Sequence, residues 1–186
     1  TTATIPTLRI TNDDGSASAN DITGSVEFFT EDSSDPNRIS AFMRNISETN
    51  AGVNYSLIFG TKDSNIAGDA TEKLRIRSDG KVGIGTDEFT STLQIYGAND
   101  GEGTATGQLT LKDTAEYNAS PTAGIIFQGK HTANSQAIFA GIRGFKENAT
   151  DTNYAGALAF DVRAHGAVAY EAMRIDSGGR VLIGTT

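Results

Sequence analysis

Hydrophobic and polar residues alternate along two stretches of the chain, 72–86 and 171–185. In the first stretch, one face takes Leu74, Ile76, Val82 and Ile84, and the other takes Lys73, Arg75, Arg77 and Lys81. A period of two indicates β-strands. The pairs Asp79-Gly80 and Gly178-Gly179 interrupt the stretches, and such pairs favour tight hairpin turns. We therefore predict two β-hairpins, each with its apolar face buried.

Similar alternation, separated by turn-rich segments, predicts further strands. They are expected at 24–30, 38–46, 55–62 and 93–97, and then at 107–112, 123–129, 137–145, 155–163 and 168–176. No window of 12 or more residues keeps helical spacing of apolar residues without a Gly or β-branched interruption. The sequence therefore predicts an all-β chain with almost no helix.

The two hairpin stretches are copies of each other at an offset of 99 residues, with nine of fifteen positions identical. The repeated structural motif comprises Glu72, Arg75, Ile76, Gly80, Val82, Ile84, Gly85 and Thr86 in the first copy, and Glu171, Arg174, Ile175, Gly179, Val181, Ile183, Gly184 and Thr185 in the second. Upstream, Ile39–Arg44 matches Ile138–Arg143 at the same offset. The chain is therefore predicted to contain tandem units.

We expect two antiparallel β repeat units, sandwich-like or intertwined, at residues 1–86 and 87–186. Thr1 stands as far from Leu8 as Thr86 stands from Leu93, so the segment is in phase with the repeat. From this phase we expect that it belongs to a longer array. Small units bury a limited core, and β-units with that problem often stack or form symmetric oligomers.

Composition narrows the classes of function. The chain has 15 basic and 23 acidic side chains, a net charge of −8, and no Cys. Thiolate metal sites and Cys nucleophiles are therefore excluded. The acidic balance argues against a nucleic-acid partner, because binding phosphates requires concentrated Lys and Arg. No apolar stretch approaches the roughly 20 residues that span a bilayer, so no membrane insertion is expected.

The hairpin segment from Met173 to Thr186, with its partner Leu74 to Thr86, resembles a repeat of bacteriophage tail fibres and other virion fibres. Those repeats read Arg-Ile, a Ser/Gly turn, Val-Gly-Ile-Gly-Thr and a Ser/Thr-rich passage into Leu-x-Ile; here that passage runs from Thr86 to Ile95. Leu182 replaces the usual Gly. The resemblance implies a homotrimeric virion appendage with a structural and adhesive role. Similar repeats also occur in bacterial surface proteins.

Candidate catalytic or metal-binding residues are few. His131 and His165 do not occupy matching positions in the two units, which favours solvated loop histidines over catalysis. Asn12-Asp13-Asp14-Gly15 and the segment 99–103 are acidic, but neither completes a calcium loop, and turn formation explains their composition. We expect no catalytic residue, no cofactor and no metal site, although calcium shared between subunits stays open.

Other polar and aromatic residues have both structural and binding interpretations. Because Glu72, Arg75 and Arg44 recur as Glu171, Arg174 and Arg143, we favour ion pairs across strands or subunits over receptor contacts. The tyrosines are candidates for stacking on sugar rings, although core or interface packing is the favoured role. They are Tyr55, Tyr96, Tyr117, Tyr154 and Tyr170.

The sequence thus favours a non-enzymatic segment of a viral fibre, located in the virion. Its expected partners are two further copies of itself, other virion proteins, and a host-surface glycan or protein receptor. The residues that contact a receptor are not identifiable from sequence. One alternative is a free-standing carbohydrate-binding β-sandwich module. Another alternative is a polysaccharide depolymerase region, which would require a pair of carboxylates such as Glu27 and Glu72.

Overall fold

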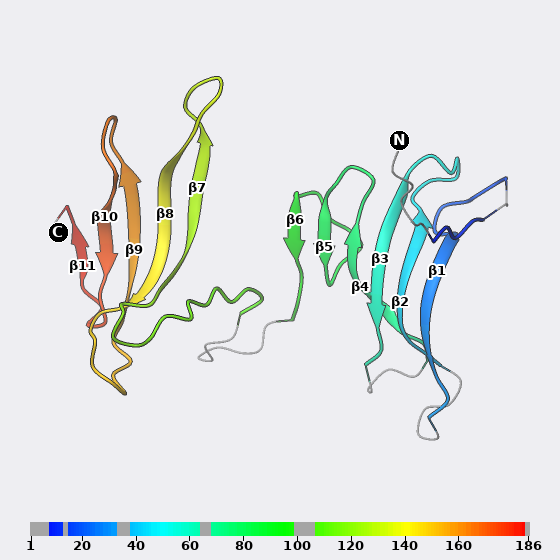
Figure 1. Ribbon diagram of the computed structural model, residues 1–186, viewed down its shortest axis with the longest axis horizontal. Coiled ribbons are helices and arrows are strands. Elements are labelled where there is room, and N and C mark those ends of the chain that lie inside the picture. Colours follow the sequence, from blue (N-terminus) through cyan, green and yellow to red (C-terminus); the bar gives the residue numbers. More distant parts are fainter. Residues whose placement is uncertain (1–7, 13–14, 33–37, 64–67, 99–106, 185–186) are drawn as a thin grey trace, which may run out of the picture. The chain divides into compact units, whose positions relative to one another are not determined.

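The computed structural model describes residues 8–12, 15–32, 38–63, 68–98 and 107–184 (Figure 1). Within these ranges the chain forms strands and no helix, which confirms the all-β prediction. The strands are β1 (Ile22–Thr30), β2 (Arg38–Ser47), β3 (Tyr55–Thr61), β4 (Thr71–Ile76), β5 (Val82–Ile84), β6 (Leu93–Ile95), β7 (Thr122–Lys130), β8 (Gln136–Lys146), β9 (Gly156–Arg163), β10 (Ala169–Ile175) and β11 (Val181–Ile183).

The chain divides into two compact units, Thr1–Leu109 and Thr110–Thr186. The first contains one sheet in the order β1-β2-β3-β4-β5-β6, and the second contains one sheet in the order β11-β10-β9-β8-β7. Adjacent strands are antiparallel except for β5 and β6, which are parallel. The boundary expected between residues 86 and 87 falls inside the first sheet, because β6 continues it beyond β5.

The predicted hairpins form at both expected places. Strand β4 pairs with β5, and β10 pairs with β11. Gly80 and Gly179 occupy the turns with φ of 81° and 75°, a conformation that side chains other than Gly rarely adopt. Replacement of the usual Gly by Leu182 leaves the second hairpin intact.

The strand predicted at 107–112 is wrong. These residues are described, but they lie outside both sheets. Leu109 and Leu111 alternate with polar residues as a strand requires. Alternation alone does not make a strand, however, because the backbone also needs a neighbouring strand to complete its hydrogen bonds. Among the described residues no strand pairs with this segment.

The internal repeat holds at the level of strand register. In the first sheet Val26, Met43, Phe59, Leu74 and Ile84 lie opposite one another across β1 to β5. In the second sheet Ile125, Ile142, Phe160, Met173 and Ile183 lie opposite one another across β7 to β11. These rows correspond one to one, so the repeated sequence builds the same ladder twice.

Both sheets also contain the same two irregularities. A register shift interrupts β1–β2 between Phe28 and Phe29, and another interrupts β7–β8 between Phe127 and Gln128. The two shifts are 99 residues apart, which is the offset of the repeat. The other irregularity lies in the β3–β4 pair and in the β9–β10 pair. There the pairing skips Lys73 in β4 and Ala172 in β10. Bulges of this kind redirect side chains within a strand.

Each sheet has an apolar face and an opposite face that carries ion pairs, here called the ion-pair face. Partner residues in a ladder share a face, and neighbours in a strand lie on opposite faces. The apolar face of the first sheet carries Val26, Phe28, Met43, Leu57, Phe59, Leu74, Ile76, Val82, Ile84, Leu93 and Ile95. That of the second carries Ile125, Phe127, Ile142, Leu158, Phe160, Val162, Met173, Ile175, Val181 and Ile183.

Burial is concentrated on the ion-pair face of the first sheet. Phe42, Ile46 and Ile58 form a small buried cluster there, together with Ala70 and the adjoining Ile39. In β3 the buried residues Ser56, Ile58 and Gly60 alternate with half-buried or exposed residues of the apolar face. The expectation that the hairpins bury their apolar faces is therefore wrong within one chain.

Each unit thus has one sheet in its described residues, rather than the two facing sheets of a sandwich. Phe28 of the first apolar face is 62% exposed, and Ile183 of the second is 72% exposed. In the described part of the chain there is also no helix with the length and hydrophobicity needed to cross a membrane.

Candidate functional site

The repeated Glu and Arg side chains form an ion pair at the same place in each sheet. Arg75 donates to Glu72 through Nε and Nη2 at 2.8 and 2.7 Å. Arg174 donates to Glu171 in the same two-pronged way at 2.6 and 3.0 Å. Two residues three apart in a regular strand point to opposite faces. The skipped residue between them brings both onto the ion-pair face, so the bulge creates the pair.

These contacts shift the pKa values of Arg75, Glu171 and Arg174. The hydrogen bonds that Arg75 donates to Glu72 raise the pKa of Arg75, and those that Arg174 donates to Glu171 raise the pKa of Arg174. The pKa of Glu171 lies below its ordinary value, chiefly because Arg174 donates to it, with a further contribution from Arg143. Arg75, Arg174 and Glu171 therefore stay ionised at neutral pH, as a structural role requires.

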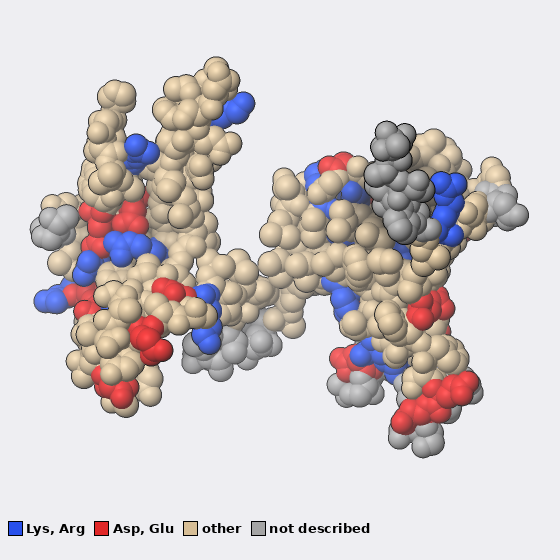
Figure 2. Space-filling view, in the orientation of Figure 1, with Lys and Arg blue, Asp and Glu red and all other residues tan. Residues whose placement is uncertain are grey.

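The third repeated residue, Arg44 or Arg143, changes its partner between the units. Arg44 on β2 pairs with Glu27 on β1 at 2.7 Å. Arg143 on β8 instead pairs with Asp161 on β9 and with Glu171 on β10, both at 2.8 Å. The sequence matches this exchange, because Ile126 stands where Glu27 would recur. Figure 2 shows acidic and basic side chains adjoining over the second sheet.

The two arginines also lie over aromatic rings. The Arg44 guanidinium is 4.0 Å from the centroid of Phe42, and that of Arg143 is 4.7 Å from the centroid of Phe145. Such contacts add the attraction between a cation and the face of an aromatic ring. The predicted ion pairs are thus present within the chain, and they join residues of the same strand as well as neighbouring strands.

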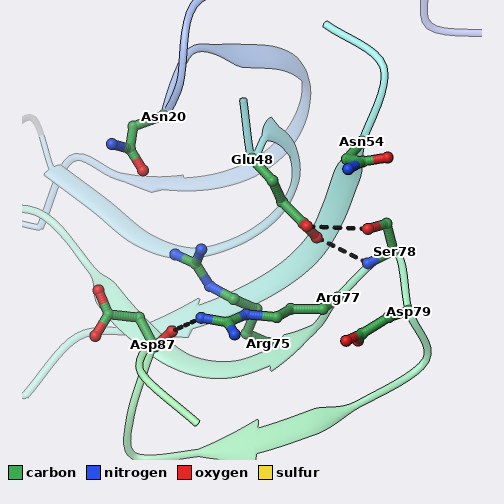
Figure 3. A pocket seen from close by; sticks show the side chains of 8 residues that line it. All are labelled: Asn20, Glu48, Asn54, Arg75, Arg77, Ser78, Asp79 and Asp87. Atoms are coloured by element: carbon green, nitrogen blue, oxygen red, sulfur yellow. Dashed lines mark hydrogen bonds between the residues drawn. The ribbon is translucent and has the colours of Figure 1, made fainter. Parts of the chain in front are cut away.

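A polar pocket of about 460 Å³ opens beside the first hairpin (Figure 3). Its lining residues are Asn20, Glu48, Asn54, Arg75, Arg77, Ser78, Asp79 and Asp87. Glu48 accepts hydrogen bonds from the Ser78 backbone N–H and hydroxyl at 2.7 and 2.9 Å. Arg77 donates to the backbone carbonyl of Asp87 at 2.6 Å.

Glu48 also accepts a hydrogen bond of 2.6 Å from the Ser56 hydroxyl. Burial favours the neutral acid, but the donors from Ser56 and Ser78 outweigh it, so the pKa of Glu48 lies below its ordinary value. An ionised Glu48 therefore ties the turn after β2 to the first hairpin. Glu147 contacts the backbone N–H of Ser177 in the second unit, more weakly at 3.4 Å.

The pocket contains both repeated and unrepeated residues. Glu48, Arg75 and Ser78 recur as Glu147, Arg174 and Ser177. The other hydrogen-bonding residues do not recur: at the offset of 99, Ala119, Asp176 and Gly178 replace Asn20, Arg77 and Asp79, and at the local offset of 101, Ala155 replaces Asn54. The first unit therefore has a set of polar groups that the shared architecture does not require.

Glu48 is a residue that the sequence analysis missed. The match between the units extends past Arg44 and Arg143 to Glu48 and Glu147 at the same offset, so the signal was present in the repeat. Phe89 is another. It is 96% buried, with its ring over Gly83, and the Arg77 guanidinium lies 4.3 Å from its centroid. A single aromatic residue in a loop gives no comparable sequence signal.

The remaining candidates lie apart from this pocket. His131 and His165 are exposed in the loops after β7 and β9. All five tyrosines are at least 37% exposed, so none packs in a core within the single chain. Thr185 of the repeated structural motif lies outside the described residues. So do Asp13, Asp14 and the segment 99–103, which were considered for calcium. Among the described residues no group of three or more His, Cys, Asp or Glu side chains is placed to hold a metal ion.

Comparison with known proteins gives fold similarity only. No family model matches the chain, and no curated protein matches it. A solved structure of the carboxy-terminal domain of the bacteriophage T5 L-shaped tail fibre is 8% identical over 97% of this chain and 87% of its own, with a TM-score of 0.41. The same domain with its intra-molecular chaperone domain is also 8% identical, with a TM-score of 0.40, and the chain spans 60% of it.

Proposed function

We propose that this chain is a structural and adhesive segment of a phage tail fibre or related virion appendage. It assembles as a homotrimer, joins other virion proteins and contributes to host attachment without catalysing a reaction. The observation that carries this proposal is the apolar face of each sheet, which the described part of the chain leaves without a second layer. The fibre assignment and the number of three copies rest on the resemblance of the hairpin repeats.

The extent of the uncovered faces supports self-association. In the first sheet Phe28, Met43 and Phe59 are 62, 39 and 38% exposed. In the second sheet Ile125 and Phe127 are 47 and 50% exposed. Soluble monomers rarely expose contiguous apolar patches of more than a few hundred Å², because exposed apolar surface in water is unfavourable. Two matching faces in one chain therefore favour a partner that repeats as the chain does.

A further copy of the same chain meets this requirement. Within each unit, three copies arranged around one axis could bring their apolar faces together and leave their ion-pair faces outward. The paired Glu and Arg side chains suit an outer surface, since they are charged and already bonded. Three equivalent weak receptor sites on such an assembly gain avidity through effective concentration.

The carboxylates support a structural role over the depolymerase alternative. Glu27 and Glu72 each accept hydrogen bonds from an arginine, Arg44 and Arg75. The pKa of Glu27 is lowered by hydrogen bonds, chiefly from Ser25 and then from Arg44. A glycosidase needs one carboxylic acid with a raised pKa as its proton donor.

Neighbouring residues on opposite faces offer a matched test of the assembly. Phe28 and Phe29 are 62 and 58% exposed, and Ile125 and Ile126 are 47 and 62% exposed. In each pair only the first residue lies on the apolar face. The double variant Phe28→Asp/Ile125→Asp should dissociate the trimer in sedimentation velocity, while Phe29→Asp/Ile126→Asp should sediment as the unsubstituted chain does. Equal behaviour of the two variants would argue against assembly through the apolar faces.

The polar pocket favours a second candidate function, the binding of a polyhydroxylated ligand such as a host-surface glycan. Amide, guanidinium and carboxylate groups that the second unit lacks line this pocket, and they match the mixed donors and acceptors of sugar hydroxyls. Retention on immobilised polysaccharides should fall in Asn20→Ala/Asn54→Ala, which copies the second unit. Undiminished retention of that variant on every polysaccharide that binds the unsubstituted chain would exclude this pocket.

A further inference from the structure

One row of residues that crosses the ion-pair face differs between the two sheets. In the first sheet the row runs across β1 to β4 and consists of Glu27, Phe42, Gly60 and Glu72. In the second sheet it runs across β7 to β10 and consists of Ile126, Gly141, Asp161 and Glu171. Only the last position keeps its residue type. The second sheet therefore lacks an aromatic ring in this row, where the first sheet has one.

In the first sheet the ring of Phe42 completes the apolar layer of the ion-pair face. Its side chain is 5% exposed, and its ring lies over Gly60 on the neighbouring strand. Ala70 and Ile39 pack in the same cluster. The Arg44 guanidinium lies 4.0 Å from the ring centroid. One ring thus covers the apolar groups around it and contacts an arginine.

A hollow of about 300 Å³ lies at this place in the second sheet. Among its lining residues are Ile126, Ile138, Gly141, Arg143, Asp161 and Ala169. Ile138 and Ala169 are the counterparts, at the offset of 99, of residues that adjoin Phe42 in the first sheet. Ala70 is 8% exposed, whereas Ala169 is an exposed residue. The groups that Phe42 covers in the first unit are therefore uncovered among the described residues of the second.

The backbone of β8 does not require the glycine that opens this hollow. Gly141 has no positive φ. A Cβ there would lie 3.4 Å from the Ile125 carbonyl oxygen and 3.7 Å from a carboxylate oxygen of Asp161, which are ordinary contacts. A glycine inside a strand weakens the strand, and it often marks a place where another group approaches closely. The missing side chain thus leaves space for a group from outside the sheet.

The chemistry of the hollow suits an aromatic side chain better than a sugar. Isoleucine, alanine and glycine groups make up much of its lining. At its polar side, Asp161 accepts hydrogen bonds from Arg143 through both oxygens at 2.8 and 3.2 Å, and Arg143 also donates to Glu171 at 2.8 Å. These groups are engaged with one another, whereas sugar hydroxyls need partners of their own. An aromatic ring needs none, and it is attracted to a neighbouring guanidinium.

We infer that this hollow binds an aromatic side chain of a partner protein, in the place that Phe42 occupies in the first sheet. The inference goes beyond the proposed function, because it gives the second unit a docking site that the first unit fills with its own ring. The hollow lies within one unit of one chain, so the site does not depend on the number of copies. In the proposed assembly the ion-pair face is outward, which leaves the hollow accessible.

A small aromatic probe tests the hollow. In saturation-transfer difference NMR, the ring protons of N-acetyl-L-phenylalaninamide should receive saturable magnetisation from the 186-residue chain. The variant Ile126→Glu/Gly141→Phe/Asp161→Gly gives the second sheet the row of the first, so a ring of its own fills the hollow. After circular dichroism has verified its fold, binding should fall at least about tenfold, the factor that burial of one apolar side chain supplies. Equal binding to both proteins, or none to the unsubstituted chain, would overturn the inference.

Single substitutions separate the hollow from the rest of the ion-pair face. Ile126 and Phe29 both lie on that face and are 62 and 58% exposed, but only Ile126 lines the hollow. Ile126→Glu should weaken binding of the probe at least about threefold, because a charge beside a buried ring is unfavourable. Phe29→Glu should leave binding unchanged.

Neither single substitution should alter sedimentation of the chain, so a change in probe binding is distinguishable from a failure of the proposed trimer. Equal effects of Ile126→Glu and Phe29→Glu on binding would contradict the assignment of the probe to the hollow. Displacement of the probe by an equal concentration of methyl α-D-glucoside would overturn the choice of an aromatic ligand in favour of a sugar.

Discussion

The ring of Phe89 packs over Gly83, so β5 and the segment leading to β6 fit together because residue 83 has no side chain. Arg77 also holds this segment, because it donates hydrogen bonds to the backbone carbonyls of Asp87 and Phe89 at 2.6 and 3.0 Å. The junction after the first hairpin is thus held by one ring, one glycine and one guanidinium. This arrangement keeps the edge strand in register beyond the repeated motif.

Substitution of Gly83 by Leu should disturb this junction. The added side chain occupies the place of the Phe89 ring, and overpacking of this kind costs about 1–3 kcal/mol. We expect a lower free energy of unfolding in urea and faster amide exchange at Tyr96. The double variant Gly83→Leu/Phe89→Thr removes the ring that the added side chain would meet, so it should recover much of the loss. Equal stability of the single and double variants would contradict this packing.

Removal of the Arg143 side chain should destabilise the second sheet more than removal of Arg180. Arg143 joins Asp161 and Glu171 across three strands, whereas the Arg180 side chain is 80% exposed and pairs with Asp176 in the adjoining turn. Loss of a part-buried charged hydrogen-bonding group costs about 1–3 kcal/mol. Urea unfolding of Arg143→Ala and Arg180→Ala at one chain concentration would compare them, and a larger loss for Arg180→Ala would contradict the assigned roles.

Stability should decline in acid because Glu171 is ionised in the folded chain. Its pKa is lowered, so the stabilisation is complete above the unfolded pKa of about 4.3 and is lost as pH falls through the lower folded value. The variant Glu171→Gln should lose stability at pH 7 and show a shallower decline below about pH 4.3. Parallel pH profiles for the two proteins, measured by urea unfolding, would rule out this contribution.

Substitution of a turn glycine should lower thermal stability more than substitution of a glycine inside a strand. Gly80 has a φ of 81°, which costs other residues about 1–2 kcal/mol, whereas Gly144 in β8 has no positive φ and open space at its Cβ position. We expect Gly80→Ala to lower the melting temperature and Gly144→Ala to change it little. Thermal unfolding followed by circular dichroism measures both, and the reverse order would contradict the hairpin geometry.

The sequence predicted the strands well because alternation and turn residues are local signals. The repeat also predicted that Arg44 and Arg143 serve equivalent structural roles. It could not predict that Arg143 would use Asp161 in place of Glu27, because a carboxylate on either neighbouring strand satisfies the same guanidinium. The bulges at Lys73 and Ala172, which bring Glu and Arg to one face, have no local signature in the sequence.

Two other features escaped sequence reasoning for a related reason. Leu109 and Leu111 have the pattern of a strand, but pairing depends on a partner elsewhere in the chain. The apolar faces were expected to be buried, because alternation identifies a face without showing what covers it. Burial of the ion-pair face around Phe42 instead depends on Gly60, which leaves room for the ring. Strand pairing and burial in these places depend on contacts between residues that are far apart in the sequence.

The absolute mass of the 186-residue chain in solution tests the central claim most directly. Light scattering after size exclusion should give a mass about three times 19.5 kDa. Such a mass is expected if identical copies cover the apolar faces. A folded, stable species of 19.5 kDa would contradict it and would favour a self-contained binding module.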